Sequence, residues 1–189
     1  VKFNGVTWTG YNTSNSGLSS NGIHSIIMDG IGNKWIGTGY GLTKYDGTNW
    51  VNVGNAGFSA GIATWESLAF SPSGQPYVSY TDYANSLKAT VMTFNGTSWE
   101  NVGNAGFSSG EVDNTKLAVS PAGEPYIIYI DYANSLKATV MKFNGVDWIN
   151  VGPMGFSAGE IDYPNIAFSP LGEPYVAYVD YSYPNFDTS

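Results

Sequence analysis

The sequence is dominated by an internal repeat, which constrains the fold more than any other feature. A segment of the form aromatic-x-Gly-x-x-Trp occurs four times and ends at Trp8, Trp50, Trp99 and Trp148, in steps of 42, 49 and 49 residues. The segment DYANSLKATVM occurs without change at 82–92 and 131–141, and NVGNAGFS at 52–59 and 101–108. Repeats of this length indicate that one supersecondary unit is copied along the chain.

Each repeat carries signals for four short strands. In the unit that begins near residue 64, β-rich runs alternate with a Pro/Gly turn at 71–76, a polar segment at 82–87 and an Asn-Gly turn at 95–96. Four antiparallel strands in every 40–50 residues are typical of the blades of a β-propeller. A β-solenoid would need a much shorter repeat. The fold class predicted is therefore all-β, a four-bladed β-propeller.

The two ends of the chain are predicted to be complementary parts of one blade. The blades are expected at about 23–53, 64–102, 113–151 and 164–189, the last closed by residues 1–12, so that 1–189 is a single domain. Such pairing would cover strand edges that otherwise stay open. The repeat register fits a closed four-bladed ring, or half of an eight-bladed ring formed by two chains.

Composition limits the classes of function. The net charge is −8 and no Lys/Arg cluster occurs, so nucleic acid is not an expected partner. No apolar run approaches the ~20 residues that span a bilayer. The chain has no Cys and one His, His24, which excludes thiolate and multi-His metal sites. Starting at Val1 without a leader, it is expected to be a mature product or a piece of a longer protein.

One blade carries a recognisable motif. In residues 26–50 the pattern Asp-x-x-Gly-x-x-Trp-x-Gly-Thr-x-x-Gly-Leu-x-x-Tyr is formed by Asp29, Gly32, Trp35, Gly37, Thr38, Gly41, Leu42 and Tyr45. This blade resembles the two-component-regulator propeller repeat, which implies an extracytoplasmic sensor region, often for polysaccharide fragments. The other blades have Tyr77, Tyr126 and Tyr175 in place of the Trp and resemble repeats of bacterial surface proteins. An extracellular, cell-surface or periplasmic location is expected.

Repeated aspartates are the candidate metal ligands. Asp82, Asp131 and Asp180 each follow a predicted second strand, and Tyr40 stands at the fourth equivalent place. Carboxylates arranged in a ring could bind Ca²⁺, which takes six to eight oxygen ligands. The alternative is that each aspartate caps the following turn through nearby backbone amides.

Aromatic and amide side chains in the predicted loops are the candidate ligand-binding residues. They are Trp65, Tyr83, Tyr132, Tyr163 and Tyr181, beside Asn114 and Asn165. Flat rings can cover the apolar face of a sugar while amides bind its hydroxyl groups. Tyr83 and Tyr132 could instead recur because they pack between blades. Trp65 and Tyr163 are the stronger candidates, because their loops differ between repeats and loop variation on a constant frame favours binding.

The sequence therefore predicts a non-enzymatic, secreted or cell-surface module that binds a carbohydrate or a protein on an acidic, Tyr-rich loop face. The alternative is a structural subunit that associates with copies of itself. A glycoside-active enzyme is the third hypothesis, but repeat-related aspartates share one environment, whereas catalytic carboxylate pairs need two. The four repeated tryptophans are expected to be structural.

Overall fold

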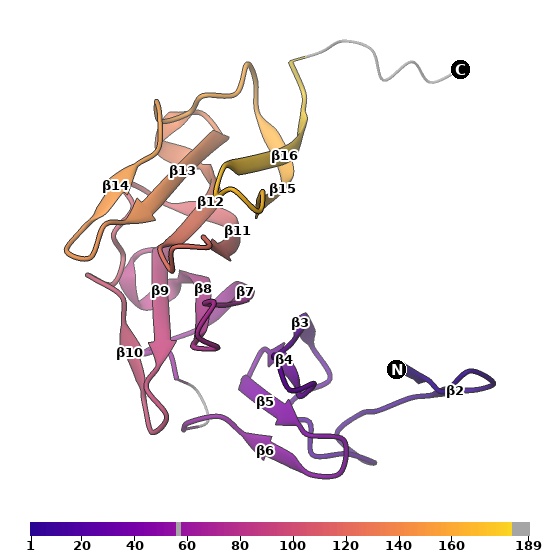
Figure 1. Ribbon diagram of the computed structural model, residues 1–189. Helices are drawn as coiled ribbons and strands as arrows, with labels where there is room; N and C mark the ends of the chain where they lie inside the picture. Colours follow the sequence, from indigo (N-terminus) through magenta and orange to yellow (C-terminus); the bar gives the residue numbers. More distant parts are fainter. Residues whose placement is uncertain (56–57, 183–189) are drawn as a thin grey trace, which may run out of the picture. The chain divides into compact units, whose positions relative to one another are not determined.

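The structure is a computed structural model that describes residues 1–55 and 58–182 (Figure 1). The chain divides into two compact units, Val1–Phe58 and Ser59–Ser189, and each is described by itself. The described residues form antiparallel sheets linked by tight turns. None of the helices among them is long and apolar enough to cross a membrane.

The first unit contains a four-stranded sheet and a hairpin. The sheet runs in the order β3 (Ile23–Met28), β4 (Lys34–Thr38), β5 (Gly41–Tyr45), β6 (Trp50–Asn52), and the hairpin pairs β1 (Lys2–Phe3) with β2 (Trp8–Thr9). The turn between β3 and β4 is fixed by Asp29, whose carboxylate accepts hydrogen bonds from the Asn33 amide and, at 2.9 Å, from Trp35 Nε1. Desolvation raises the pKa of the Asp29 carboxyl, but these hydrogen bonds outweigh it and lower the pKa to about 2.

The second unit contains two four-stranded sheets and one two-stranded sheet, in repeat order (Figure 1). The first sheet is β7 (Ala63–Phe70), β8 (Pro76–Asp82), β9 (Lys88–Phe94) and β10 (Trp99–Asn101). The second is β11 (Val112–Val119), β12 (Pro125–Asp131), β13 (Lys137–Phe143) and β14 (Trp148–Asn150). The third pairs β15 (Ile161–Phe168) with β16 (Pro174–Asp180). Short 3₁₀ helices, η1 (Tyr83–Asn85) and η2 (Tyr132–Asn134), follow β8 and β12.

The core of the second unit lies between the faces of neighbouring sheets. Ala69 and Val91 of β7–β10 pack with Leu117 and Ile127 of β11–β14, and the opposite face of β11–β14 packs against β15–β16. Trp148 is buried at the first of these interfaces, where its Nε1 donates to Val102 O at 2.7 Å. Burial of apolar side chains on both faces of β11–β14 is the main contribution to the stability of this unit.

Four antiparallel strands per repeat are confirmed by the three complete sheets. The pairing of residues 1–12 with 164–189 stays a prediction: β1–β2 and β15–β16 are separate two-stranded sheets in the described part of the chain, and 183–189 lie outside it. Closure into a ring and the extent of the single domain also stay predictions. The repeated tryptophans are not equivalent, because Trp148 is buried whereas Trp8 is largely exposed.

Candidate ligand-binding site

The inner strands of the second unit, β7, β11 and β15, share an irregularity. The antiparallel register breaks between Thr64 and Ser67 in β7, between Asp113 and Lys116 in β11, and between Asp162 and Asn165 in β15. The breaks recur at the repeat spacing, so they form a row across three neighbouring sheets with β11 in the middle. A bulge bends its strand and re-aims the side chain that it carries, which makes these positions candidates for a site.

Each bulge contains a residue with a left-handed backbone. The φ angle is +59° at Trp65, +48° at Asn114 and +48° at Tyr163. Asn adopts this conformation readily, but a bulky aromatic residue rarely does, and the cost for a residue other than glycine is about 1–2 kcal/mol. The same unfavourable backbone is therefore kept for three different side chains. Such outliers cluster at functional sites.

Hydrogen bonds hold the bulges in place. The amide of Asn114 donates to the Asp113 carboxylate at 2.9 Å, and the amide of Tyr163 donates to the Asp162 carboxylate at 2.8 Å. Thr115 Oγ1 donates to the carbonyl oxygen of Trp65 at 3.0 Å, which joins the bulge of β11 directly to that of β7. The positions of Trp65 and Asn114 are therefore coupled through the backbone.

The three side chains differ in exposure. Trp65 is 46% exposed and Tyr163 is 70% exposed, whereas Asn114 between them is only 4% exposed. Within the described residues the Asn114 carboxamide makes no hydrogen bond, and its backbone amide bonds to Asp113. Ser25 Oγ is the one fully buried side-chain polar atom without a partner among the described residues, so the polar atoms of the Asn114 carboxamide still reach solvent. The row therefore offers two accessible aromatic rings and one free hydrogen-bonding group.

Two charged residues beside the row were not singled out from the sequence. Glu66 follows Trp65 and is buried, and Lys116 lies two residues after Asn114 and is half-buried. Burial lowers the pKa of the Lys116 ammonium. The sequence predicts that Trp65, Asn114 and Tyr163 lie in loops, but the structure places them within the inner strands β7, β11 and β15. Only the register break itself could have revealed the bulges.

The repeated aspartates Asp82 and Asp131 have the capping role that the sequence offered as one alternative. Asp82 Oδ1 accepts from the Ala84 amide at 3.0 Å, and Oδ2 accepts from Asn85 Nδ2 and Thr90 Oγ1, both at 2.8 Å. Asp131 repeats this pattern, and both carboxylates are buried. Each therefore fixes the 3₁₀ turn and ties it to the third strand of its own sheet.

Asp180 forms a related cap at the end of β16. It accepts hydrogen bonds from the amides of Ser182 at 2.9 Å, Gly159 at 3.1 Å and Ala158 at 3.2 Å. Hydrogen bonding to Ser182, with smaller contributions from Gly159 and Ala158, lowers the pKa of Asp180. No cluster of three or more His, Asp or Glu side chains that could hold a metal occurs in the chain as far as it is described. Calcium binding by these aspartates stays a prediction.

The remaining sequence candidates lie in other turns. Tyr83 and Tyr132 begin η1 and η2 and are half-exposed, so neither ring is buried between sheets. Tyr181 follows β16 and is also exposed, and Asn165 lies just after the third bulge, where its Oδ1 accepts from the Ile166 amide. The structure thus brings Trp65, Asn114 and Tyr163 into equivalent positions and leaves the other tyrosines in separate turns.

No protein-family model matches the sequence, and no curated protein sequence is significantly similar to it. Solved structures are similar in fold. The extracellular domain of a B. thetaiotaomicron protein described as a one component system, BT4673, has a TM-score of 0.59 at 14% identity over 88% of this chain and 22% of that one. A second extracellular domain from that organism, BT3049, has a TM-score of 0.59 at 16% identity over 92% and 23%.

A structure described as YCF48 bound to D1 peptide has a TM-score of 0.56 at 18% identity, over 92% of this chain and 52% of that one. The chain therefore spans between about a fifth and a half of the length of these three proteins. At these identities the likeness shows the fold alone. It places the chain in the class of all-β proteins built from propeller-like blades.

Proposed function

We propose that the chain is a non-enzymatic, extracellular binding module that holds an oligosaccharide along the inner-strand bulges, through Trp65, Asn114 and Tyr163. One observation carries this proposal: the same left-handed bulge recurs in three sheets while its residue changes from Trp to Asn to Tyr. A constant backbone with varying side chains is the arrangement expected where specificity resides. A purely structural bulge would favour Gly or Asn at all three positions.

The side chains of the row suit a sugar. The rings of Trp65 and Tyr163 are accessible and can cover the apolar faces of two sugar units. Between them, the unpartnered carboxamide of Asn114 can bind a hydroxyl group as both donor and acceptor. Lys116, half-buried two residues further along β11, adds a cationic donor for a polar or acidic substituent.

Two further observations support a non-enzymatic, extracellular role. The similar solved structures include extracellular domains of bacterial signalling proteins. The buried carboxylates of Asp82 and Asp131 accept hydrogen bonds within their own turns and share one environment, unlike a catalytic pair. A peptide is the second class of ligand, because the similar YCF48 structure is described as bound to a D1 peptide.

The test is binding to an array of bacterial and plant polysaccharide fragments, with peptides as a parallel panel. Trp65→Asn and Tyr163→Asn keep a residue that tolerates the left-handed backbone and remove the rings. Each is expected to weaken binding of the strongest glycan about tenfold, the equivalent of about 1.4 kcal/mol.

Tyr40→Asn is the matched control, because Tyr40 is as exposed as Tyr163 but lies in the turn between β4 and β5. Glycan binding should be unchanged in this variant. Binding to peptides alone would reassign the ligand class, and binding that is insensitive to Trp65 and Tyr163 would contradict the site.

A further inference from the structure

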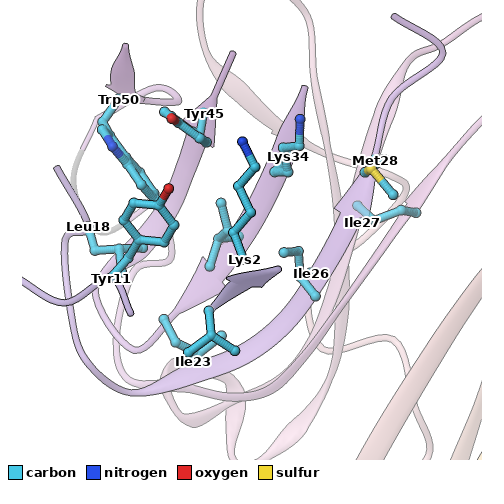
Figure 2. Close-up of a pocket in the computed structure, with 12 residues that line it drawn as sticks. Lys2, Tyr11, Leu18, Ile23, Ile26, Ile27, Met28, Lys34, Tyr45 and Trp50 are labelled. Atoms are coloured by element: carbon cyan, nitrogen blue, oxygen red, sulfur yellow. The ribbon is translucent and has the colours of Figure 1, made fainter. Parts of the chain in front are cut away.

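The first unit exposes an apolar sheet face. Ile26 of β3 is 66% exposed, and Ile23 and Met28 on the same strand are also exposed. Ile23, Ile26, Tyr45 and Trp50 line a hollow of about 480 Å³. Figure 2 shows these side chains with Lys2 of β1 beside them. An apolar surface of this kind on a sheet commonly marks a contact with another protein surface.

This face is the counterpart of one that the second unit buries. The pair Ile26–Ile36 in β3–β4 has the same register as Leu117–Ile127 in β11–β12, and Tyr45–Trp50 has the same register as Phe143–Trp148. In the second unit Leu117, Ile127 and Trp148 are buried against β7–β10, with Leu117 only 6% exposed. The face of β3–β6 is therefore built to receive another sheet.

The complementary surface, the face that packs on a following sheet, is exposed on β15–β16. The pair Ala69–Tyr77 packs against β11–β14, and the equivalent Ala118–Tyr126 packs against β15–β16, where Tyr126 is 8% exposed. The third pair, Ala167–Tyr175, has the same register, but Tyr175 is 61% exposed. Among the described residues of its unit, no further sheet follows β15–β16.

We propose that the apolar face of β3–β6 receives the β15–β16 sheet of a second copy of this chain. The contact at β15–β16 supplies the geometry: the ring of Tyr126 packs edge-on against Phe168, with centroids 4.9 Å apart. Met28 occupies the position of Phe168, because Met28–Lys34 and Phe168–Pro174 are equivalent pairs. Tyr175 of one copy therefore packs on Met28 of the other. This association is independent of the sugar-binding site.

Two observations favour a second copy as the occupant. Within the described residues β15–β16 is a two-stranded sheet, and the β1–β2 hairpin repeats the sequence that joins the third and fourth strands of a complete sheet: FNGVTW at 3–8 matches FNGVDW at 143–148, which joins β13 to β14. Val1 and Lys2 line the hollow, so the hairpin already lies beside the face that the incoming sheet would cover.

The test is the molecular mass of the 189-residue chain by sedimentation equilibrium and light scattering. We expect a dimer that dissociates at least tenfold more readily in Ile26→Glu and in Tyr175→Glu. Ile149→Glu is the matched control, because Ile149 is a partly exposed residue of β14 and the equivalent residue of β10 is Glu100. It should leave the dimer unchanged.

The chain has no cysteine, so a disulfide can identify the contact directly. Met28→Cys and Tyr175→Cys chains, mixed under oxidising conditions, are expected to form a mixed disulfide dimer. A monomer at all concentrations, or a disulfide formed only within a chain that carries both substitutions, would overturn the proposal. Glycan binding by such a monomer would leave the proposed function intact.

Discussion

The aspartate turns and the inner-strand bulges recur with the same spacing, but the turns repeat both sequence and hydrogen bonds, whereas the bulges repeat only the backbone conformation. Asp82 and Asp131 lie in segments of identical sequence, and their buried carboxylates make the same hydrogen bonds. The bulges keep the backbone while the residue changes from Trp65 to Asn114 to Tyr163. The turns therefore have a structural role, since both oxygens of each buried carboxylate accept hydrogen bonds from the turn and the third strand. The bulges have the character of a site, because side chains vary on strained backbone and one amide is left without a partner.

Asp131→Ala should produce the largest loss of stability. Its carboxylate is buried and accepts from the Ala133 amide, Asn134 Nδ2 and Thr139 Oγ1. Removing it leaves buried donors unsatisfied, which should lower the free energy of unfolding by about 3 kcal/mol. Urea denaturation measures this, and Asp131→Asn, which keeps one acceptor oxygen, should lose less. A loss under about 1 kcal/mol in the alanine variant would contradict the role of the turns as a frame.

Thr139→Val tests the link between the turn and the third strand. Thr139 Oγ1 donates to Asp131 at 2.8 Å and accepts from the Gly155 amide at 2.9 Å. The isosteric substitution removes both bonds without changing the volume of the side chain, and we expect a loss of about 1–2 kcal/mol in the same assay. Thr48→Val, at an exposed turn of the first unit, serves as the control, and an equal loss there would argue against a specific link.

Tyr163→Asn should have almost no effect on stability. The ring is mostly exposed, and Asn adopts the left-handed backbone at lower cost than Tyr. The free energy of unfolding should stay within about 0.5 kcal/mol of wild type or rise by up to about 1 kcal/mol. Thermal and urea unfolding can both measure this. A clear destabilisation would mean that the Tyr163 side chain stabilises the fold, as the aspartate turns do, and would contradict the difference between the two regions.

Asp180 should produce the smallest effect, visible only as a pH dependence. Hydrogen bonds from Ser182, Gly159 and Ala158 lower its folded-state pKa below the ordinary value of 3.8. Its contribution to stability is therefore present above pH 4 and is lost as the pH falls through the lowered pKa. Comparing wild type with Asp180→Asn from pH 6 to pH 2.5 should show a difference that shrinks in acid. A difference that grows on acidification has the wrong sign for this account.

Sequence patterns predict the frame well because its determinants are local. Strand order, turns and the caps at Asp82 and Asp131 follow from residue types at fixed spacing. The bulges escape such reasoning, because Trp and Tyr have high β-propensity and give no sign of a positive φ angle. The burial of the repeated tryptophans also cannot be predicted from the repeat. Trp8 and Trp148 occupy equivalent positions in the sequence, but Trp148 is buried against a neighbouring sheet whereas Trp8 is largely exposed.

The carboxamide of Asn114, at the centre of the row, gives the most direct test of the site. Asn114→Gly keeps a residue that accepts the left-handed backbone and removes the side chain with its carboxamide. Calorimetric titration with the strongest glycan from the array measures its contribution to affinity, and urea denaturation checks the fold. The account predicts about tenfold weaker binding with unchanged or increased stability. Unchanged affinity in a correctly folded Asn114→Gly chain would contradict a ligand site at the bulges.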